Sequence, residues 1–196
     1  MAVQQHSIAT LLDKYGRIRI RMLCAFVAVY EADSSCRRGG EICNLSTNTI
    51  STGLHNLENI LQVELFRYAG RGKSLSPADF AHELYPVAKN ICSTLNHRLS
   101  GYYSVSDVVF YILLARVKSI GQASRLMGFS VSNGIEKINT IESWTGNKLF
   151  NRNGRRGVNL TMEGYAYLKK SIKVVESIDT IEQLLLGLND KIQVKL

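Results

Sequence analysis

The chain has 196 residues, of which 45% are hydrophobic and 20% are charged, and this composition excludes a disordered protein. Its length suits one large domain or two small ones. The formal net charge is +8, with 11 basic against 8 acidic residues in positions 1–100 and 13 against 8 in positions 101–196, so both halves are basic. This excess either serves solubility or indicates an anionic partner such as nucleic acid.

Signals for membranes, metals and catalysis are missing from the sequence. It contains no run of about 18 apolar residues and no secretory leader pattern, so we expect a cytoplasmic protein without membrane contact. No recognisable nucleophile, phosphate-loop or zinc-protease motif occurs, which predicts that the protein is not an enzyme and needs no cofactor or metal. The four cysteines are expected to be reduced, with Cys24 and Cys43 as small core residues and Cys36, beside two arginines, as a core residue or a thiol of lowered pKa.

The first predicted elements lie between residues 16 and 44. The segment GRIRIR, residues 16–21, alternates cations with isoleucines, as in a short strand or an arm along a nucleic-acid backbone. An apolar run from Met22 to Tyr30 predicts a helix, and Ser35 is a candidate N-cap for a second helix that ends near Asn44. Gly39 and Gly40 each cost that helix about 1 kcal/mol relative to alanine, so we expect it to be irregular.

The third predicted helix belongs to NLSTNTISTGLHNLENILQVELF, residues 44–66. Ser46 is its candidate N-cap, and its apolar residues Ile50, Leu54 and Leu57 recur at helical spacing on one face. The polar residues Thr47, Asn48, Ser51, Thr52 and His55 therefore lie outward or on the flanks.

A basic hairpin and a long helix follow. RYAGRGKSLS, residues 67–76, predicts a hairpin with Gly70 in its turn. Ser76 and Pro77 predict the cap and first position of the next helix, in which Pro86 is expected to cause a bend or a break. The apolar stripe of this helix is Phe80, Leu84, Val87, Ile91 and Leu95.

The whole order recurs 84 residues later. Identical pairs include Ser46/Ser130, Glu58/Glu142 and Phe66/Phe150, and the apolar positions match as well. The second copy has a helix over residues 108–115, candidate caps at Ser119, Ser130 and Thr161, a hairpin in NRNGRRGVNLT with Gly154 in its turn, and a final stripe at Leu168, Ile172, Val175, Ile178, Ile181, Leu185 and Leu188. Phe129 and Trp144 are predicted to be core residues. Tyr102 and Tyr103 are predicted to pack between the two copies, with stacking on a nucleic-acid base as the alternative.

The order of helix, helix-turn-helix, hairpin and helix is that of a winged helix-turn-helix. The sequence thus predicts a mainly α fold with small β wings, in two tandem domains over residues 1–100 and 101–196 that divide near Gly101.

Both copies resemble the DNA-binding domain of LysR-type transcriptional regulators. The first does so through LSTNTISTGLHNLENILQVELF and GRGKSLSPADF, and the second through SIGQASRLMGFS, residues 138–142 and 148–152, and LTMEG. SIGQASRLMGFS also resembles the ModE-type domain. The departures are Gly39-Gly40 in place of paired alanines, Tyr68 in place of an arginine and Ile135 in place of a serine. The resemblance covers the DNA-binding domain of that family and not its long effector-binding domain, so inducer sensing is not expected.

The resemblance implies a bacterial, sequence-specific regulator of transcription that binds double-stranded DNA. Short polar side chains near the N-terminus of a helix in the major groove reach base edges, while flanking cations contact phosphates. The candidate reading residues are Ser46, Thr47, Asn48, Thr49, Ser51, Thr52, Ser130, Ser132, Asn133, Glu136 and Lys137, with Glu136 accepting from cytosine N4. The candidate wing cations, on the backbone or in the minor groove, are Arg67, Arg71, Lys73, Arg152, Arg155 and Arg156.

The equivalent of the long helix pairs two subunits in the LysR family. We therefore expect the two long helices of one chain to pack together as a pseudo-dimer, and the longer second helix to allow a homodimer of whole chains. The alternative function is a protein-interaction module, an antiactivator or co-regulator that contacts the transcription machinery, in which one or both winged helices no longer bind DNA. Gly39-Gly40 and the first hairpin favour that alternative.

Overall fold

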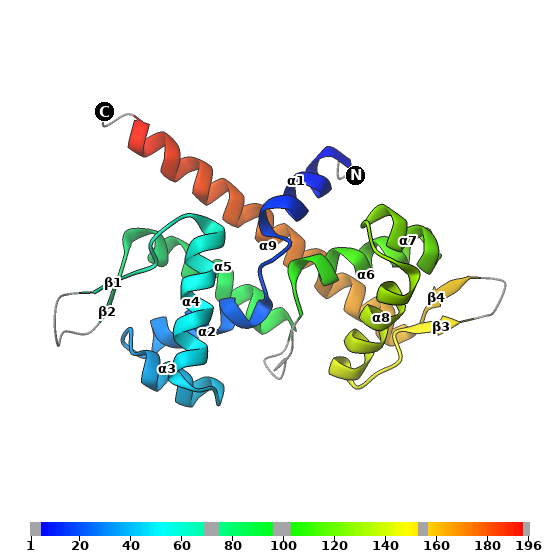
Figure 1. Cartoon of the computed structure of the whole chain (residues 1–196), viewed down its shortest axis with the longest axis horizontal. Coiled ribbons are helices and arrows are strands. Elements are labelled where there is room, and N and C mark those ends of the chain that lie inside the picture. Colours follow the sequence, from blue (N-terminus) through cyan, green and yellow to red (C-terminus); the bar gives the residue numbers. More distant parts are fainter. Residues whose placement is uncertain (1–4, 69–74, 96–102, 153–156, 194–196) are drawn as a thin grey trace.

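Two winged helix-turn-helix units make up the computed structural model, which describes residues 5–68, 75–95, 103–152 and 157–193 (Figure 1). The predicted mainly α fold with small β wings is confirmed. The first unit consists of α1 (Gln5–Tyr15), α2 (Ile20–Glu31), α3 (Cys36–Cys43), α4 (Thr47–Leu61), β1 (Phe66–Tyr68), β2 (Leu75–Pro77) and α5 (Asp79–Leu95). The second consists of α6 (Val105–Val117), α7 (Ile120–Leu126), α8 (Val131–Thr145), β3 (Phe150–Arg152), β4 (Val158–Leu160) and α9 (Met162–Gln193).

The wings are antiparallel two-stranded sheets at opposite ends of the molecule (Figure 1). In the first wing Arg67 pairs with Ser76, and in the second Asn151 pairs with Asn159. The predicted turn glycines Gly70 and Gly154, and the domain division near Gly101, lie outside the described residues.

Serine caps set the starts of the helix-turn-helix helices in both units, as predicted. The Ser35 and Ser119 hydroxyls accept the backbone N–H of Arg38 and Gln122 at the starts of α3 and α7, both at 3.3 Å. Ser46 and Ser130 cap α4 and α8 in the same way, at 3.2 and 3.1 Å. Each bond satisfies one of the N–H groups that a helix start leaves without an intrahelical acceptor. Thr161 caps α9 through the N–H of Gly164, at 2.9 Å.

A glutamate carboxylate joins α4 to the first wing, and another joins α8 to the second. Glu58 Oε1 accepts the N–H groups of Leu65 and Phe66, at 2.8 and 3.2 Å. Glu142 Oε1 does the same for Leu149 and Phe150, at 2.9 and 3.2 Å. This shared role explains why a glutamate recurs at the same place in both copies.

The expectation of an irregular α3 is wrong. The helix runs without interruption from Cys36 to Cys43, with both glycines buried inside it. A Cβ on Gly39 would lie 2.7 Å from Val29 Cγ2, and one on Gly40 would lie 2.7 Å from the carbonyl oxygen of Leu45. The glycines therefore allow α3 to approach α2 and the following turn closely, and this packing outweighs their low helix propensity.

The predicted start of α5 is also wrong. Ser76 and Pro77 belong to β2, and the helix begins at Asp79. Proline suits this strand because it pairs there with Phe66 at the edge of a two-stranded sheet. Pro86 does not break α5, which is continuous to Leu95.

The predicted packing of the two long helices is confirmed, although the buried face of α9 differs from the predicted stripe. α5 and α9 pack along each other, and Asn90 Nδ2 donates to Ser177 Oγ at 3.2 Å. Ile178 and Ile181 are buried as expected, but so are Ser171, Val174 and Ser177, while Ile172 is 42% exposed. The Ser171 and Ser177 hydroxyls donate to the carbonyl oxygens of Tyr167 and Lys173 within α9, and Ser177 also accepts from Asn90, so these buried hydroxyls are satisfied.

Aromatic side chains fill the core of the second unit. Tyr103 is buried, makes an edge contact with Trp144 at 5.0 Å between ring centroids, and accepts a hydrogen bond from Tyr167 at 2.5 Å. Trp144 and Phe129 are only half-buried, so they border the core rather than lie within it. Tyr102 lies outside the described residues.

Helix α1, which packs against α6 and α4, was not predicted from the sequence. Leu11 and Tyr15 are buried at i, i+4 spacing, a helical signal, and Lys14 forms an ion pair with Glu182 of α9 at 3.2 Å. No helix of the described ranges is both long and apolar enough to cross a bilayer.

A central ribbon connects the units. It consists of residues 16–20 and residues 103–106. The short strand predicted for residues 16–21 is reduced to one bridge at Arg19, because Ile20 and Arg21 already begin α2. Arg19 and Ser104 form an antiparallel bridge. The two segments are held by the hydrogen bonds Ile20 N–Tyr103 O, Val105 N–Ile18 O and Ser106 N–Gly16 O, at 2.9, 2.9 and 3.2 Å.

Candidate nucleic-acid interface

The N-terminal half of α4 exposes four short polar side chains: Thr47, Asn48, Ser51 and Thr52. Its apolar residues Ile50, Leu54 and Leu57 are buried on the opposite face, as predicted. Ser46 and Thr49 are engaged with each other, with their hydroxyl oxygens 2.8 Å apart, and Thr49 is half-buried. Of the six predicted reading residues on this helix, these two contribute to the cap, and the other four face solvent.

The start of α8 shows the same arrangement with different side chains. Ser130 is the cap, and Ser132, Asn133 and Glu136 are exposed. Gly134 is buried because its Cα faces α7, where a Cβ would lie 2.2 Å from Ser124 Oγ. The exposed groups of α8 therefore include an amide and a carboxylate, whereas those of α4 are hydroxyls and one amide.

Lys137 is half-buried and already has a partner within the protein. Its ammonium group forms an ion pair with Asp107 of α6 and lies 4.8 Å from the centroid of the Phe129 ring. Asp107 also closes the capping box of α6 by accepting the N–H of Ser104 at 2.8 Å. Lys137 therefore braces α8 against α6, and it would have to leave Asp107 to reach a phosphate.

The wing cations are described only in part. Arg67 is exposed on β1 and pairs with Glu64 at 3.0 Å, a contact between solvated side chains that contributes little stability. The backbone of Arg152 lies in β3. Arg71, Lys73, Arg155 and Arg156 lie outside the described residues.

Arg37 is a cation beside α4 that was not predicted as a site residue. It lies on α3, exposed, and lines the same shallow surface hollow as Ser46 and Thr47. It pairs with Glu41 at 3.4 Å, where both side chains are largely exposed. The position equivalent to Arg37 in the second unit is Gly121. Its place in the sequence could have indicated this position, because Arg37 follows the cap Ser35 by two residues and so lies in the first turn of α3, the helix before α4.

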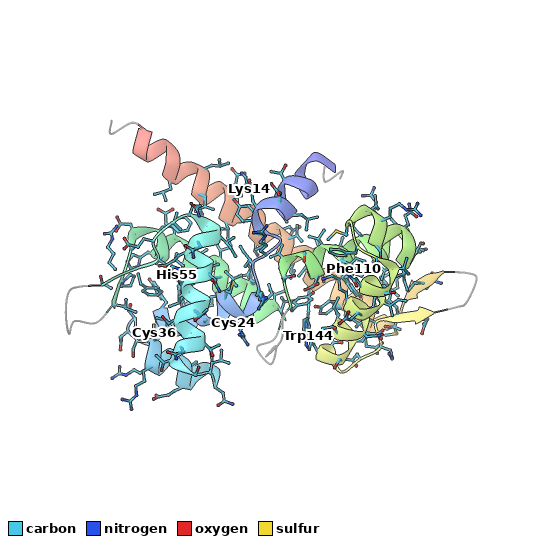
Figure 2. The ribbon with its side chains drawn as sticks, viewed as in Figure 1. Lys14, Cys24, Cys36, His55, Phe110 and Trp144 are labelled. Atoms are coloured by element: carbon cyan, nitrogen blue, oxygen red, sulfur yellow. The ribbon has the colours of Figure 1, made fainter. Side chains whose placement is uncertain are left out.

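Cys24, Cys43 and Cys92 lie close together. The sulfur atoms of Cys24 and Cys92 lie 3.0 Å apart, and Cys43 Sγ lies 3.8 Å from the carbonyl oxygen of Cys24. Burial raises the pKa of Cys36, so the interpretation of Cys36 as a thiol of lowered pKa is wrong. Side chains are shown in Figure 2, which labels Cys24 and Cys36 in the first unit. Within the described ranges no group of three or more His, Cys, Asp or Glu side chains could hold a metal ion.

Comparison with known proteins gives three findings. The uncharacterized HTH-type transcriptional regulator YdcI of Escherichia coli (strain K12) is 30% identical over 70 residues, which are 36% of this chain and 22% of that protein. A crystal structure of Vibrio fischeri DarR in complex with DNA, described as a LysR-type regulator, matches with a TM-score of 0.39 and 22% identity over 46% of this chain and 30% of that one. The chain thus spans less than a third of the length of either protein.

The third finding is a match to the family model for bacterial regulatory helix-turn-helix proteins of the LysR family, which occurs twice, at residues 20–80 and 106–165. The two matches together cover more than half of the chain, and each spans one complete helix-turn-helix with its wing. This chain belongs to the LysR family of bacterial regulatory helix-turn-helix proteins.

Proposed function

We propose that the protein is a sequence-specific, double-stranded-DNA-binding regulator of transcription that places α4 and α8 in the major groove. The observation that carries this proposal is the pair of exposed polar faces at the N-terminal halves of α4 and α8. Both helices begin at serine caps, and both pack against the preceding helix of a helix-turn-helix. A major groove about 12 Å wide admits a helix of about that diameter, and short side chains let the helix backbone approach base edges.

The exposed side chains supply the hydrogen-bonding groups that base reading needs. Asn48 and Asn133 each carry an amide that both donates and accepts, which suits a bidentate contact with adenine N6 and N7. Glu136 accepts hydrogen bonds only, which suits the N4 amino group of cytosine. Because α4 and α8 present different groups, the two helices read different bases.

The cations on and beside the wings supply affinity without sequence preference. Arg67 on β1 and Arg37 beside the α4 start are exposed, and their surface ion partners can be exchanged for phosphate at little cost. Arg71, Lys73, Arg152, Arg155 and Arg156 complete this set in the proposal. The protein-interaction alternative drew support from Gly39-Gly40 and from the first hairpin. The first of these grounds is removed because α3 is regular, and the tip of the hairpin lies outside the described residues. Pairing of whole chains through the far end of α9 stays a prediction.

Binding measurements on paired variants test the division between base reading and phosphate binding. Asn133→Ala should weaken binding to a site selected from a random DNA pool by about 1 to 3 kcal/mol, with little change on random duplex. Ser143→Ala is the matched control, because Ser143 is exposed on α8 three turns beyond the cap. Arg155→Ala with Arg156→Ala should weaken both duplexes alike and reduce the salt slope by about 0.9 for each phosphate that these arginines neutralise.

The outcomes separate the two functions. Salt-sensitive binding to random duplex together with a selected preferred site supports the proposal. A chain that shows no salt-sensitive affinity for any duplex at low salt, and yields no preferred site, would favour the protein-interaction module instead.

A further inference from the structure

The central ribbon presents two arginines between the winged units. Its residues alternate in burial: Ile18 and Ile20 are buried, with exposed fractions of 0% and 1%, while Arg17 and Arg19 are exposed. The isoleucines anchor the segment in the core, and the backbone hydrogen bonds to residues 103–106 fix its direction. Because cations alternate with buried isoleucines in the sequence, Arg17 and Arg19 both lie on the solvent side of the ribbon.

Both arginines line a hollow of about 820 Å³ with walls from both units. Asn56 and Asn59 of α4 form part of one wall, and Lys137 of α8 with Asp107 of α6 forms part of the other. The ribbon therefore lines a groove between α4 and α8, the two predicted recognition helices. In Figure 1 these helices lie on either side of the centre, with the wings at the two outer ends.

This groove is continuous with the predicted reading faces. On α4, Asn56 follows Asn48 and Thr52 at four-residue spacing, so the three share one side of the helix. On α8, Asn133 and Glu136 line a smaller hollow of about 320 Å³, which shares Asp107 and Lys137 with the larger one. A duplex that touches the reading faces of both helices spans the space between α4 and α8, and Arg17 and Arg19 line the hollow in that space.

The groove is positively charged, and the ribbon supplies half of its cations. Lys14, Arg17, Arg19 and Lys137 line the larger hollow, against the carboxylates of Asp13 and Asp107. The two lysines form ion pairs with Glu182 and Asp107, and the two arginines line the same hollow from the ribbon. An arginine presents a planar fork of donors that matches two phosphate oxygens, so this pair is suited to an anionic backbone.

We propose that Arg17 and Arg19 bind phosphates of the DNA segment between the two half-sites, which are the base pairs contacted by α4 and those contacted by α8. This proposal rests on the proposed function, because it takes α4 and α8 to lie on one duplex. The ribbon then contacts the backbone over base pairs that neither recognition helix reads. These contacts add affinity whatever the intervening sequence, and they fix the distance between duplex and protein at the centre of the complex.

The test compares the double variant Arg17→Gln, Arg19→Gln with the charge-matched control Lys169→Gln, Lys173→Gln, which removes two exposed cations of α9. Fluorescence anisotropy on a selected site between about 50 and 200 mM salt gives the slope of log affinity against log salt. The slope of the arginine variant should be smaller by about 0.9 for each phosphate that the arginines neutralise, and the control should keep the wild-type slope. Arg17→Lys with Arg19→Lys keeps the charges and should retain most of the slope.

A chemical change in the DNA gives a second measurement. Neutral methylphosphonates in place of the phosphates between the half-sites should weaken wild-type binding and leave the binding of the glutamine variant unchanged. The inference is overturned if the wild-type protein shows salt-sensitive binding and the glutamine variant keeps both the wild-type salt slope and the sensitivity to methylphosphonates. That result leaves the proposed function standing. A wild-type protein without salt-sensitive binding overturns the proposed function itself.

Discussion

Replacing Glu142 by alanine should destabilise the second unit far more than most surface changes. The carboxylate side chain is 5% exposed and accepts the backbone N–H groups of Leu149 and Phe150, both of which are buried residues. Without Glu142 these two donors have no acceptor, and each buried unsatisfied donor costs about 1 to 3 kcal/mol. The expected decrease in the free energy of unfolding is therefore about 2 to 6 kcal/mol. The ion pair with Lys148 adds little, because the lysine side chain is 78% exposed.

Two further variants separate the acceptor from the charge. Glu142→Gln keeps an oxygen that can accept both N–H groups, so it should cost only about 1 kcal/mol. Glu58→Ala removes the equivalent carboxylate of the first unit, which is half-buried and therefore leaves its donors closer to water. Its destabilisation should be smaller than that of Glu142→Ala. Urea denaturation followed by circular dichroism measures all three.

The pH dependence gives an independent check. Burial alone would raise the pKa of Glu142, but the hydrogen bonds from Lys148, Leu149 and Phe150 outweigh it, and the pKa lies below its ordinary value. A carboxyl with a lowered pKa in the folded state stabilises the fold above the ordinary glutamate pKa of about 4.3, and this contribution disappears as the pH falls through the lowered value. The glutamine variant should lack this part of the acid destabilisation. An alanine variant within about 0.5 kcal/mol of wild type, or a glutamine variant with the full acid dependence, would refute the reasoning.

Three other changes test the packing and the thiol chemistry. Gly53→Ala should stabilise α4 by about 0.5 to 1 kcal/mol in urea denaturation, because the new Cβ would meet only Ala25 Cβ at an ordinary 3.7 Å; a decrease in stability would show that this site is tighter than the geometry indicates. Gly134→Ala should instead lower the midpoint, because its Cβ would lie 2.2 Å from Ser124 Oγ; an unchanged midpoint would contradict the close packing of α7 on α8. Burial raises the pKa of Cys36, so its alkylation by iodoacetamide should speed up at a higher pH than that of an ordinary thiol. Peptide mass spectrometry measures the alkylated fraction, and a fast reaction near pH 7 would contradict this prediction.

Local signals predict most of the helix-turn-helix. Ser46 and Ser130 are recognisable as caps because the hydroxyl and the N–H that it accepts are three residues apart in the same helix. The core face of α4 follows from the spacing of its apolar residues. These features depend on neighbours in the sequence, so the sequence suffices to find them.

Local sequence signals do not predict features that depend on contact with a residue from another helix or strand. Gly39 has the pattern of a weak helix residue, yet it is required by the closeness of Val29 in α2. Ile172 looks like part of the apolar stripe of α9, yet it is exposed, while Ser171 and Ser177 are buried and Ser177 contacts Asn90 of α5. The lysine of α8 resembles a phosphate contact, and only the position of Asp107 shows its other partner. None of these partners lies within one turn of the residue concerned.

The packing of α5 against α9 within a single chain has a consequence for orientation on DNA. In a complex of two identical subunits the protein has a two-fold axis, so it binds its site equally well after a half-turn. Here the two halves are joined in one polypeptide, and their exposed residues differ, with Asn48 and Thr52 on α4 but Asn133 and Glu136 on α8. If both helices read bases, the bound protein has a head and a tail, and its site needs no palindrome. Such a complex would present the far end of α9 toward one side of the site only, and the bound protein would then have a direction along the DNA.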